Sequence, residues 1–349
     1  MKQSAFTNKL RSLNHLYASI LILIVTLFSF AGCKEDGPVS YELEVPAWFP
    51  HMETPAGNQL TKARIELGRK LFYEPLLSLD STVSCSSCHL QQNAFSDGLP
   101  LSIGVAGAMG MRNAPTLSNI GYAPFLFADG GVQALELQAQ SPIFSLDEMH
   151  FSIAGFLDRI ENDEEYESMF SEAYDREPDA FGISRAIACF ERTMISGKSR
   201  FDQYEYQGVS NALSDQELRG KALFFSAETE CSSCHIPPLF TNYEFENIGL
   251  YTAYTDSGRA RISDQPEDRG KFKVPTLRNV EVTGPYMHNG SIASLEEVVE
   301  HFNSGGADHI NQSAYVKPLN LTNQDKADLV AFLKSLTDQS FLNNPSLVE

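Results

Sequence analysis

The pentapeptide Cys85-Ser86-Ser87-Cys88-His89 occurs a second time in this chain of 349 residues, as Cys231-Ser232-Ser233-Cys234-His235. Each copy has the pattern C-x-x-C-H, which is the attachment signature of a c-type haem. The two thiols of such a motif add to the vinyl groups of the porphyrin, and the histidine that follows becomes an axial ligand of the iron. The sequence therefore predicts two covalently bound haem c groups in one polypeptide.

A C-x-x-C pair has two other common uses, as a redox-active dithiol and as half of a zinc site. A redox dithiol does not need a histidine directly after it, and the βαβ pattern of a thioredoxin-like fold is absent around both motifs. A zinc site with four cysteines would require the two pairs to meet in space, and it would leave both histidines unused. The sequence favours haem over both alternatives.

The N-terminus has the pattern of an export signal. Three positive charges, at Lys2, Lys9 and Arg11, precede an apolar run over residues 20–30. Phe30-Ala31-Gly32-Cys33 then resembles a bacterial lipobox, which predicts that residues 1–32 are a lipoprotein signal peptide and that Cys33 carries the lipid. A short transmembrane anchor is the alternative, but a membrane span needs about 20 apolar residues, and the run over residues 20–30 is shorter than that. We therefore expect a protein anchored by lipid to a membrane in the periplasm or cell envelope, where c-type haem is attached.

The chain is acidic, with 26 Lys and Arg against 45 Asp and Glu and a formal net charge of −19 at pH 7. This charge argues against nucleic acid as a partner, and it suits a basic electron-donor protein. Of the six cysteines, four belong to the haem motifs and Cys33 belongs to the lipobox. Cys189 remains, in an apolar helical stretch where a buried cysteine behaves as a small hydrophobic residue.

The second half of the chain repeats the first. Residues 113–120 reappear as residues 273–280, and Asp129-Gly130 reappears as Asn289-Gly290, in both cases with an offset of 160 positions (113 to 273, 129 to 289). Such a repeat predicts two related domains in tandem. Short amphipathic helical patterns joined by Gly- and Pro-containing loops fill both halves, and no sustained two-residue alternation indicates a sheet. We therefore expect a mostly α fold of two tandem cytochrome c-like haem domains.

The boundary between the two domains is expected near residue 210. Residues 207–211 interrupt the helical periodicity, and Ser214-Asp215-Gln216-Glu217 resembles the capping box that begins a new helix. The predicted organisation is a linker over 33–50, an N-terminal haem domain over 51–210, a C-terminal haem domain over 211–340, and a tail over 341–349.

Taken together, these motifs resemble those of the bacterial dihaem cytochrome c peroxidase family, including its methylamine-utilisation branch. The resemblance runs from about Leu67 to Leu336 and includes Arg112-Asn113-Ala114-Pro115-Thr116-Leu117 and Gly284-Pro285-Tyr286-Met287-His288-Asn289-Gly290. It implies that the N-terminal haem is peroxidatic and that the C-terminal haem stores and relays electrons. His89 would then be the proximal ligand of the reactive iron, and His235 that of the relay iron.

The resemblance also implies roles for residues outside the haem motifs. Glu148 falls on the family's acid–base glutamate. A carboxylate suits that role because it can take a proton from peroxide and return it if its pKa lies near the working pH. The alternative for Glu148 is a solvated acid at a helix start. Gln138 falls on a distal-pocket glutamine. One calcium ion would bind the side chain of Asn113 and the backbone carbonyls of Thr283 and Pro285, because calcium prefers oxygen ligands.

Two positions on the N-terminal side depart from the family pattern. Members of the family place a distal histidine in the stretch that reads Ile103-Gly104-Val105 here, and valine cannot ligate iron. We therefore expect an N-terminal haem that reacts with peroxide without prior reduction. The family's tryptophan between the haems is replaced by Ala128, and the one tryptophan of the chain is Trp48, far upstream. Electron exchange between the haems would then be slower or use Phe127 or a nearby tyrosine.

A third departure concerns the second haem. The sixth ligand that the family supplies after the His-Asn-Gly stretch corresponds to Phe302, which has no donor atom. His301, Met287 and His309 are other candidates, and an iron without a sixth protein ligand is equally compatible with the sequence. Because the axial ligand strongly influences the potential of a haem, the sequence does not predict the potential of this one.

The leading prediction is a dihaem c-type peroxidase that reduces hydrogen peroxide at the N-terminal haem. Its electrons would come from a small donor protein, such as a cytochrome c or a cupredoxin, through the C-terminal haem. One alternative is an oxidase that uses peroxide to oxidise a partner protein or a small molecule. Another is a dihaem electron carrier or redox sensor without enzymatic activity. The resemblance also suggests a homodimer, because members of the family are often dimeric.

Overall fold

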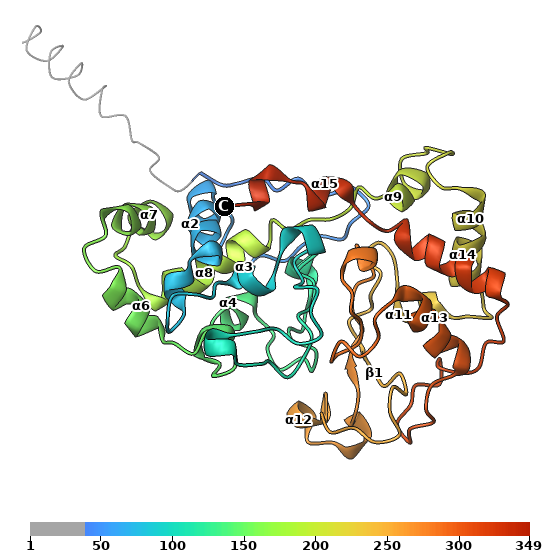
Figure 1. Cartoon of the computed structure of the whole chain (residues 1–349). Helices are drawn as coiled ribbons and strands as arrows, with labels where there is room; N and C mark the ends of the chain where they lie inside the picture. Colours follow the sequence, from blue (N-terminus) through green and yellow to red (C-terminus); the bar gives the residue numbers. More distant parts are fainter. Residues whose placement is uncertain (1–38) are drawn as a thin grey trace, which may run out of the picture. The chain divides into compact units, whose positions relative to one another are not determined.

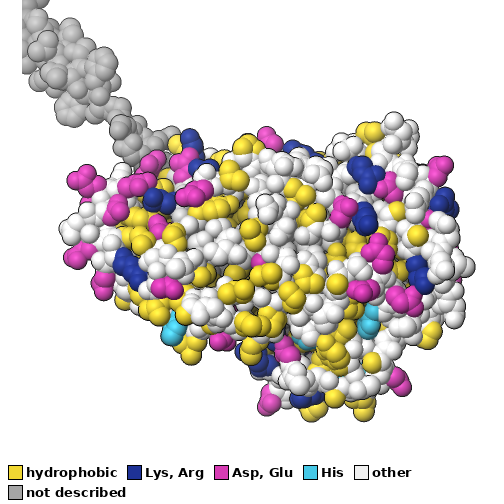
Figure 2. Space-filling model, viewed as in Figure 1, with side chains coloured by type: hydrophobic (Ala, Val, Ile, Leu, Met, Phe, Trp, Pro, Cys, Tyr) yellow, Lys and Arg dark blue, Asp and Glu magenta, His cyan; other side chains and the backbone are white. Residues whose placement is uncertain are grey.

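The computed structural model describes residues 39–349, of which residues 40–349 form one compact unit (Figure 1). The predicted signal peptide and the predicted lipid-bearing Cys33 lie outside the described residues. No helix in the described part of the chain is long and apolar enough to cross a membrane. On the face drawn in Figure 2, acidic side chains are spread widely among fewer basic ones, as the net charge of −19 leads one to expect.

The described chain is mostly helical, as the sequence predicts. The α-helices of the first part are α2 (Lys62–Tyr73), α3 (Cys85–Cys88), α4 (Leu135–Gln138), α5 (Ser141–Phe144), α6 (Ile153–Arg159), α7 (Glu164–Tyr174), α8 (Ala180–Glu191) and α9 (Arg200–Glu205). Those of the second part are α10 (Asp215–Phe224), α11 (Cys231–Cys234), α12 (Ala260–Ser263), α13 (Leu295–Ser304), α14 (Asn323–Lys334) and α15 (Gln339–Leu342). The single sheet of the described residues pairs β1 (Phe245–Glu246) with β2 (Phe272–Lys273) in antiparallel register.

Short 3-10 helices shape the long loops between these elements. They are η1 (Pro75–Leu77), η2 (Gln91–Asn93), η3 (Val105–Gly107), η4 (Ile120–Tyr122), η5 (Pro266–Asp268), η6 (Val280–Val282) and η7 (Pro345–Leu347). The two equivalent ones, η4 and η6, occupy matching places in the 160-residue repeat.

Each domain is built on the same crossing of two helices, α2 with α8 in the first and α10 with α14 in the second. A glycine stands at each crossing. A Cβ added to Gly68 would lie 1.9 Å from the carbonyl oxygen of Ala186, and one added to Gly220 would lie 1.9 Å from that of Asp328. Only glycine permits so close an approach of two backbones. The repeated crossing confirms two tandem domains of one architecture.

Each domain has its own hydrophobic core. The first core lies between α2, α6, α7 and α8, and the second is rich in phenylalanine, with Phe201, Phe224, Phe240 and Phe332 in edge or tilted contact. Phe201 belongs to α9, which comes before the domain boundary expected from the sequence but packs into the second core. Burying each such ring contributes about 1.5–3 kcal/mol to the stability of the fold.

The segment that the sequence leaves as a tail packs against the N-terminal domain. Phe341 is 1% exposed and Leu347 is 2% exposed, and the Phe341 ring lies 5.7 Å from that of Phe95. The hydroxyl of Tyr73 in α2 donates a hydrogen bond of 2.7 Å to the carbonyl of Leu347. Figure 1 shows the C-terminus (red) beside α2 (blue), with α15 further back along the same segment. The C-terminal segment therefore completes the core of the first domain.

The two domains meet through reciprocal backbone hydrogen bonds. The amide of Asn113 donates to the carbonyl of His288 at 2.9 Å, and the amide of Lys273 donates to the carbonyl of Ala128 at 2.7 Å. Asn113 and Lys273 are equivalent in the repeat, as are Ala128 and His288. The junction therefore has the reciprocity of a two-fold interface, in which equivalent residues exchange the same contact.

Candidate haem sites and peroxide pocket

Both C-x-x-C-H motifs form a single helical turn, α3 and α11. The amide of His89 donates to the carbonyl of Cys85 at 3.0 Å, and the amide of His235 donates to that of Cys231 at 3.0 Å. This turn places the two sulfurs of each motif about one turn apart, with the histidine directly at its end. The local structure is the same in both domains, as the identical sequences require.

The two motif histidines are held in one orientation. Nδ1 of His89 lies 2.7 Å from the carbonyl oxygen of Phe95, and Nδ1 of His235 lies 3.0 Å from that of Phe240. Because a carbonyl only accepts, Nδ1 carries the proton and Nε2 keeps its lone pair for a metal. Burial lowers the pKa of His89, and it lowers that of His235 to about 4, so both rings are neutral at physiological pH. Both histidines are therefore prepared to ligate iron.

The motif cysteines fit thioether attachment better than dithiol redox chemistry. Burial raises the pKa of Cys85 and Cys88, and burial followed by the charge of Glu246 raises that of Cys234 to about 11. Reactive dithiols have a lowered pKa instead. Within residues 39–349 no group of three or more His, Cys, Asp or Glu side chains could hold a metal ion, which argues against a zinc site made of both pairs. The residues present therefore fit one haem c in each domain.

Glu148 lies in the neighbourhood of the first haem motif. Its carboxylate charge raises the pKa of both Cys85 and Cys88, which places it near their sulfur atoms. Within residues 39–349 the half-buried side chain has no hydrogen-bond or salt-bridge partner. Burial, and secondly the charge of Asp147, raises the pKa of Glu148 above its usual value. A raised pKa makes this carboxyl group a better proton acceptor than an ordinary glutamate, which suits a general base.

The stretch in which the sequence lacks a distal histidine lies directly against Glu148. The amide of Val105 donates a hydrogen bond of 2.8 Å to the carbonyl of Glu148. A Cβ on Gly104 would lie 2.3 Å from the carbonyl oxygen of Asp147, so only glycine allows this approach. Val105 is 5% exposed and packs in the first core. Position 105 thus lies beside the acid–base candidate and offers no donor atom.

Gln138 is the last residue of α4 and is half-buried. Its neighbour Glu136 has a different role, because it accepts hydrogen bonds of 2.8 Å from both Arg192 and Asn58 and so fastens α4 to α8. Although burial opposes ionisation, these partners lower the pKa of Glu136. In the described chain no hydrogen bond joins Gln138 to Glu148. The structure therefore anchors α4, which positions Gln138, but records no contact between the two candidates.

The residues predicted to bind calcium lie at the domain junction. The amide of Asn113 donates to the carbonyl of His288, in the same loop as Thr283 and Pro285. Nδ2 of Asn113 donates to the carbonyl of Leu99 at 2.7 Å. These contacts bring Asn113 of the first domain to the loop of the second that carries the two predicted carbonyl ligands.

The histidines considered as sixth ligands of the second iron already have partners. Nε2 of His301 lies 3.0 Å from the carbonyl oxygen of Ile248. Nδ1 of His309 lies 3.1 Å from Nδ2 of Asn247 and accepts from the amide of Asn311 at 3.0 Å. The sequence pattern of its helix suggests a surface residue at position 301, but His301 is half-buried. Both histidines therefore have structural hydrogen bonds.

Glu191 is a buried ionisable residue near the first haem motif that sequence analysis did not single out as a candidate site residue. It is 5% exposed, and its Oε2 atom has no partner in the described chain. Burial raises its pKa to about 8, and its charge contributes to the raised pKa of Cys85. The available signal was a charged pair, Glu191 with Arg192, at the end of an otherwise apolar helical stretch. Such a pattern is also common in helices that serve only as structure.

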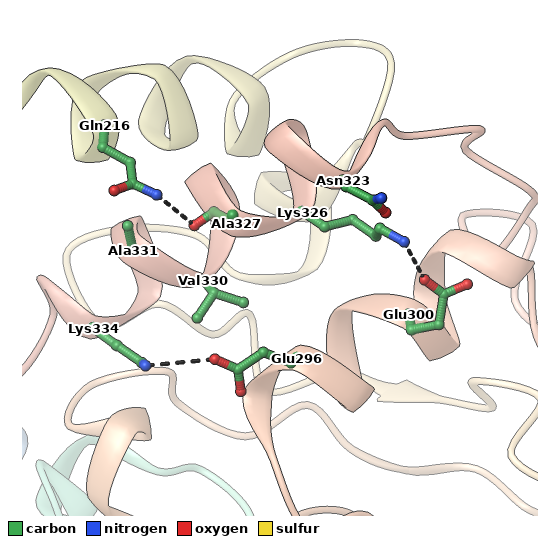
Figure 3. A pocket seen from close by; sticks show the side chains of 9 residues that line it. All are labelled: Gln216, Glu296, Glu300, Asn323, Lys326, Ala327, Val330, Ala331 and Lys334. Atoms are coloured by element: carbon green, nitrogen blue, oxygen red, sulfur yellow. Dashed lines mark hydrogen bonds and ion pairs between the residues drawn. The ribbon is translucent and has the colours of Figure 1, made fainter.

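The pocket drawn in Figure 3 lies on the C-terminal domain, between α13 and α14, and is lined mainly by surface residues. Lys326 reaches Glu300 at 2.8 Å and Lys334 reaches Glu296 at 3.5 Å across it. The charged groups in this pocket are thus paired with one another, and no haem-motif residue lines it. It is not the site of the predicted chemistry.

The fold and the two attachment sites define a c-type cytochrome with two haem domains. A family model described as di-haem cytochrome c peroxidase matches residues 62–211, and one described as cytochrome c matches residues 217–337. The chain belongs to the dihaem cytochrome c peroxidase family. It is therefore an enzyme with two haem c groups, an oxidoreductase that acts on peroxide, and the family expected from the sequence is confirmed.

Several relatives match most of the chain. The methylamine utilization protein MauG of Methylorubrum extorquens is 35% identical over 83% of this chain and 82% of its own length. The cytochrome-c peroxidase IdrP1 of Denitromonas iodatirespirans is 32% identical over 96% of this chain and 97% of its own. A solved MauG-like protein associated with microbial copper homeostasis has 35% identity and a TM-score of 0.83, covering 88% of this chain and 99% of its own. The diheme peroxidase BthA of Burkholderia thailandensis has 26% identity and a TM-score of 0.72, covering 82% of this chain and 88% of its own.

Proposed function

We propose that the protein reduces hydrogen peroxide to water at its N-terminal haem, with electrons that enter from a small donor protein through the C-terminal haem. The donor would be a cytochrome c or a cupredoxin. The two haems, when attached, supply the iron that binds peroxide and the iron that relays electrons. The surrounding residues transfer the proton, leave room for peroxide to reach the first site, and orient the peroxide for reaction.

The observation that carries this proposal is the placement of Glu148. Reduction of one peroxide molecule to two water molecules consumes two electrons and two protons, and the proton on the near oxygen must move to the departing oxygen. Glu148 has no protein partner among the described residues, lies in the neighbourhood of the first haem motif, and has a raised pKa. It can take and return this proton, while Gln138 orients the peroxide or a bridging water. General acid–base catalysis of this kind contributes about 10²–10⁴-fold.

Val105 supports direct access of peroxide to the first site. A buried valine in this stretch cannot occupy an iron position, so we expect the oxidised enzyme to bind peroxide without prior reduction. The electron paramagnetic resonance spectrum of the fully oxidised protein tests this expectation. A high-spin signal that changes on addition of peroxide supports it. A spectrum that is entirely low-spin and inert to peroxide contradicts it.

The proposed proton transfer is tested by Glu148→Gln, with Asp147→Asn as the matched control. We expect Glu148→Gln to lower kcat for peroxide by about 100-fold or more. Asp147→Asn removes the neighbouring charge and leaves the carboxyl group of Glu148 in place, so its kcat at neutral pH stays close to that of the wild type. Equal losses of kcat in the two variants would contradict the proposed proton transfer, because they would show that activity depends on the negative charge or the folding of this region and not on the carboxyl group of Glu148.

Oxidation of a partner protein or small molecule by peroxide is a second candidate, and Val105 is the observation that favours it. An enzyme whose first site is open when oxidised can react with peroxide before a reductant arrives. One equivalent of peroxide added without donor separates the two functions. Rapid return of the oxidised spectrum on adding reduced cytochrome c supports the peroxidase, whereas slow reaction with every donor supports oxidation of another substrate.

Further features that the sequence predicts belong to this proposal. Calcium bound by Asn113, Thr283 and Pro285 would clamp the junction, because these residues come from both domains. Removal of calcium by a chelator should then lower activity, and added calcium should restore it. A lipid on Cys33 would hold the enzyme at a membrane of the periplasm or cell envelope, which mass spectrometry of the mature N-terminus tests. Sedimentation of the purified protein tests the homodimer.

A further inference from the structure

Lys273 is a cation at the domain junction that has no counter-ion among the described residues. It is the second residue of β2, and its side chain is half-buried. Its ammonium group makes no hydrogen bond and no ion pair within residues 39–349. Burial lowers the pKa of Lys273 to about 8. The two buried arginines differ, because Arg192 pairs with Glu136 at 2.8 Å and Arg278 pairs with Asp202 at 2.7 Å.

This lysine lies on the connection between the C-terminal haem ligand and the N-terminal domain. Two residues later, the backbone of Pro275 contacts the imidazole of His235. On the other side, the amide of Lys273 itself bonds the carbonyl of Ala128 in the first domain at 2.7 Å. The ammonium nitrogen lies 5.7 Å from the centre of the Tyr243 ring. An aromatic face attracts a cation but does not neutralise its charge.

The first domain contributes a buried donor near this lysine. Among residues 39–349, the buried hydroxyl of Tyr122 and the buried Nε of Arg192 have no hydrogen-bond partner. Arg192 packs against Gly121, the residue before Tyr122, because a Cβ on Gly121 would lie 3.2 Å from Cγ of Arg192. Tyr122 is also close enough to Tyr243 for its charge to raise the pKa of that residue. The Tyr122 hydroxyl and the Lys273 ammonium therefore both lie near Tyr243.

The buried Tyr122 hydroxyl and the unpaired Lys273 ammonium together indicate an acceptor that the described residues do not provide. Buried polar groups are nearly always hydrogen-bonded, and an unpaired one indicates a bound ion, water or ligand. Glu191 also lies next to Arg192, but its pKa of about 8 keeps it protonated at neutral pH, so it adds no counter-charge. Haem brings two carboxylate groups of its own, the propionates. A propionate supplies both the negative charge that Lys273 lacks and the acceptor that Tyr122 lacks.

We propose that Lys273 and Tyr122 bind a haem propionate at the junction of the two domains. The contact would join a side chain of the second domain to one of the first through a carboxylate of the cofactor. It also makes Lys273 a determinant of haem potential. A positive charge beside the propionate favours the reduced iron, because the oxidised iron carries one more positive charge. Loss of that charge leaves the propionate uncompensated and lowers the potential.

The test measures the midpoint potentials of both haems by spectroelectrochemistry in the holoprotein. For Lys273→Met we expect about a tenfold rise in the oxidised-to-reduced ratio of one haem at fixed potential, which is a fall of about 59 mV for a one-electron couple. The haem whose potential falls is the one that carries the bound propionate. Lys273→Arg keeps the charge and stays close to the wild type. Tyr122→Phe lowers the potential of the same haem by a smaller amount.

Lys271→Met is the matched control, because Lys271 lies two residues away and already pairs with Asp268 at 3.0 Å. Both potentials should be unchanged in this variant. Unchanged potentials in Lys273→Met, with two haems per chain and a native circular dichroism spectrum, would overturn the proposal, as would equal shifts in the control. If Lys273→Met does not mature, Tyr122→Phe decides. A fall in one potential supports the proposal, and two unchanged potentials overturn it.

Discussion

Asp129 is the buried centre of an ion cluster that joins the two domains, and replacing it tests how the junction is held. Its carboxylate is fully buried and accepts hydrogen bonds from Arg112 at 2.7 Å, from Arg261 of the second domain, and from the amide of Gly131 at 3.0 Å. Arg112 also makes two hydrogen bonds, of 2.7 and 2.9 Å, to Asp256 in the second domain. The perturbation is Asp129→Asn, which keeps the shape and removes the charge.

The expected loss of unfolding free energy depends on which interactions the two arginines keep after Asp129 is replaced. Removing one partner of a buried ion pair costs about 3–5 kcal/mol when the other charge is left without a counter-ion. Here Arg112 keeps Asp256, and the side chain of Arg261 is 60% exposed, so water can solvate it. The loss should therefore be closer to that of hydrogen bonds to a charged group, about 1.5–3 kcal/mol of unfolding free energy at pH 7.

The effect should also depend on pH. Burial alone would raise the pKa of Asp129, but hydrogen bonds from Arg261 and Arg112 outweigh it and hold the pKa below its usual value. The unfolded state therefore binds the proton more readily than the folded state. The stabilisation is present above the unfolded pKa of about 3.9, and it is lost as pH falls through the lower folded value. The difference between variant and wild type should thus be largest at neutral pH and shrink below about pH 4.

The assay is urea denaturation at pH 7 and at pH 3, followed by far-ultraviolet circular dichroism and by haem absorbance. Asp268→Asn is the control, because Asp268 forms a partly exposed pair with Lys271 three residues away. Such a pair is worth less than about 1 kcal/mol. If Asp129→Asn loses no more than this control at pH 7, or loses equally at both pH values, the reasoning about the cluster is refuted.

Three further changes test the helix crossing, the C-terminal segment and the acid–base group. Gly68→Ala should lower the unfolding free energy by about 1–3 kcal/mol, because its Cβ would lie 1.9 Å from the facing backbone; Gly57→Ala, with its nearest atom at 3.8 Å, should lose less in the same denaturation assay. Phe341→Ala should lower the unfolding free energy by about 3–5 kcal/mol, because it leaves a cavity at a fully buried position. An unchanged denaturation midpoint would mean that the C-terminal segment does not stabilise the fold. Asp147→Asn should move the acid limb of the pH–rate profile to lower pH, because the Asp147 charge contributes to the raised pKa of Glu148; a limb that stays in place or moves upward would contradict this assignment.

The parts of the fold that sequence analysis predicts correctly are those encoded by neighbouring residues. A C-x-x-C-H motif closes one helical turn by itself, and the 160-residue repeat shows two domains without any knowledge of their packing. The capping box at Ser214 forms as predicted, with its hydroxyl accepting from the amide of Glu217. Such signals survive because each depends on contacts within a few residues along the chain.

The parts that sequence analysis misses depend on contacts between distant residues. Phe341 packs beside Phe95, although its segment is predicted from the sequence to be a tail. Trp48 stacks on Tyr206 with ring centres 5.0 Å apart, although its segment is predicted to be a linker. Asp129 finds Arg261, 132 positions away in the sequence (129 to 261). No local pattern marks a residue for a partner in the other domain. The unpaired state of Lys273 is likewise visible only once its surroundings are known.

The repeat also explains how one backbone design can hold two different sites. Phe127 and its equivalent Met287 share a positive φ, of 62° and 75°, and each precedes a residue whose carbonyl accepts the reciprocal hydrogen bond of the junction. The backbone at these positions is therefore the same in both domains, while the side chains differ. Ala128 corresponds to His288, and Asn113 corresponds to Lys273. Because the backbone hydrogen bonds do not depend on side-chain identity, the side chains at this junction were free to diverge without loss of the interface. One copy could thus acquire an amide suited to a metal ion and the other an ammonium group suited to a carboxylate.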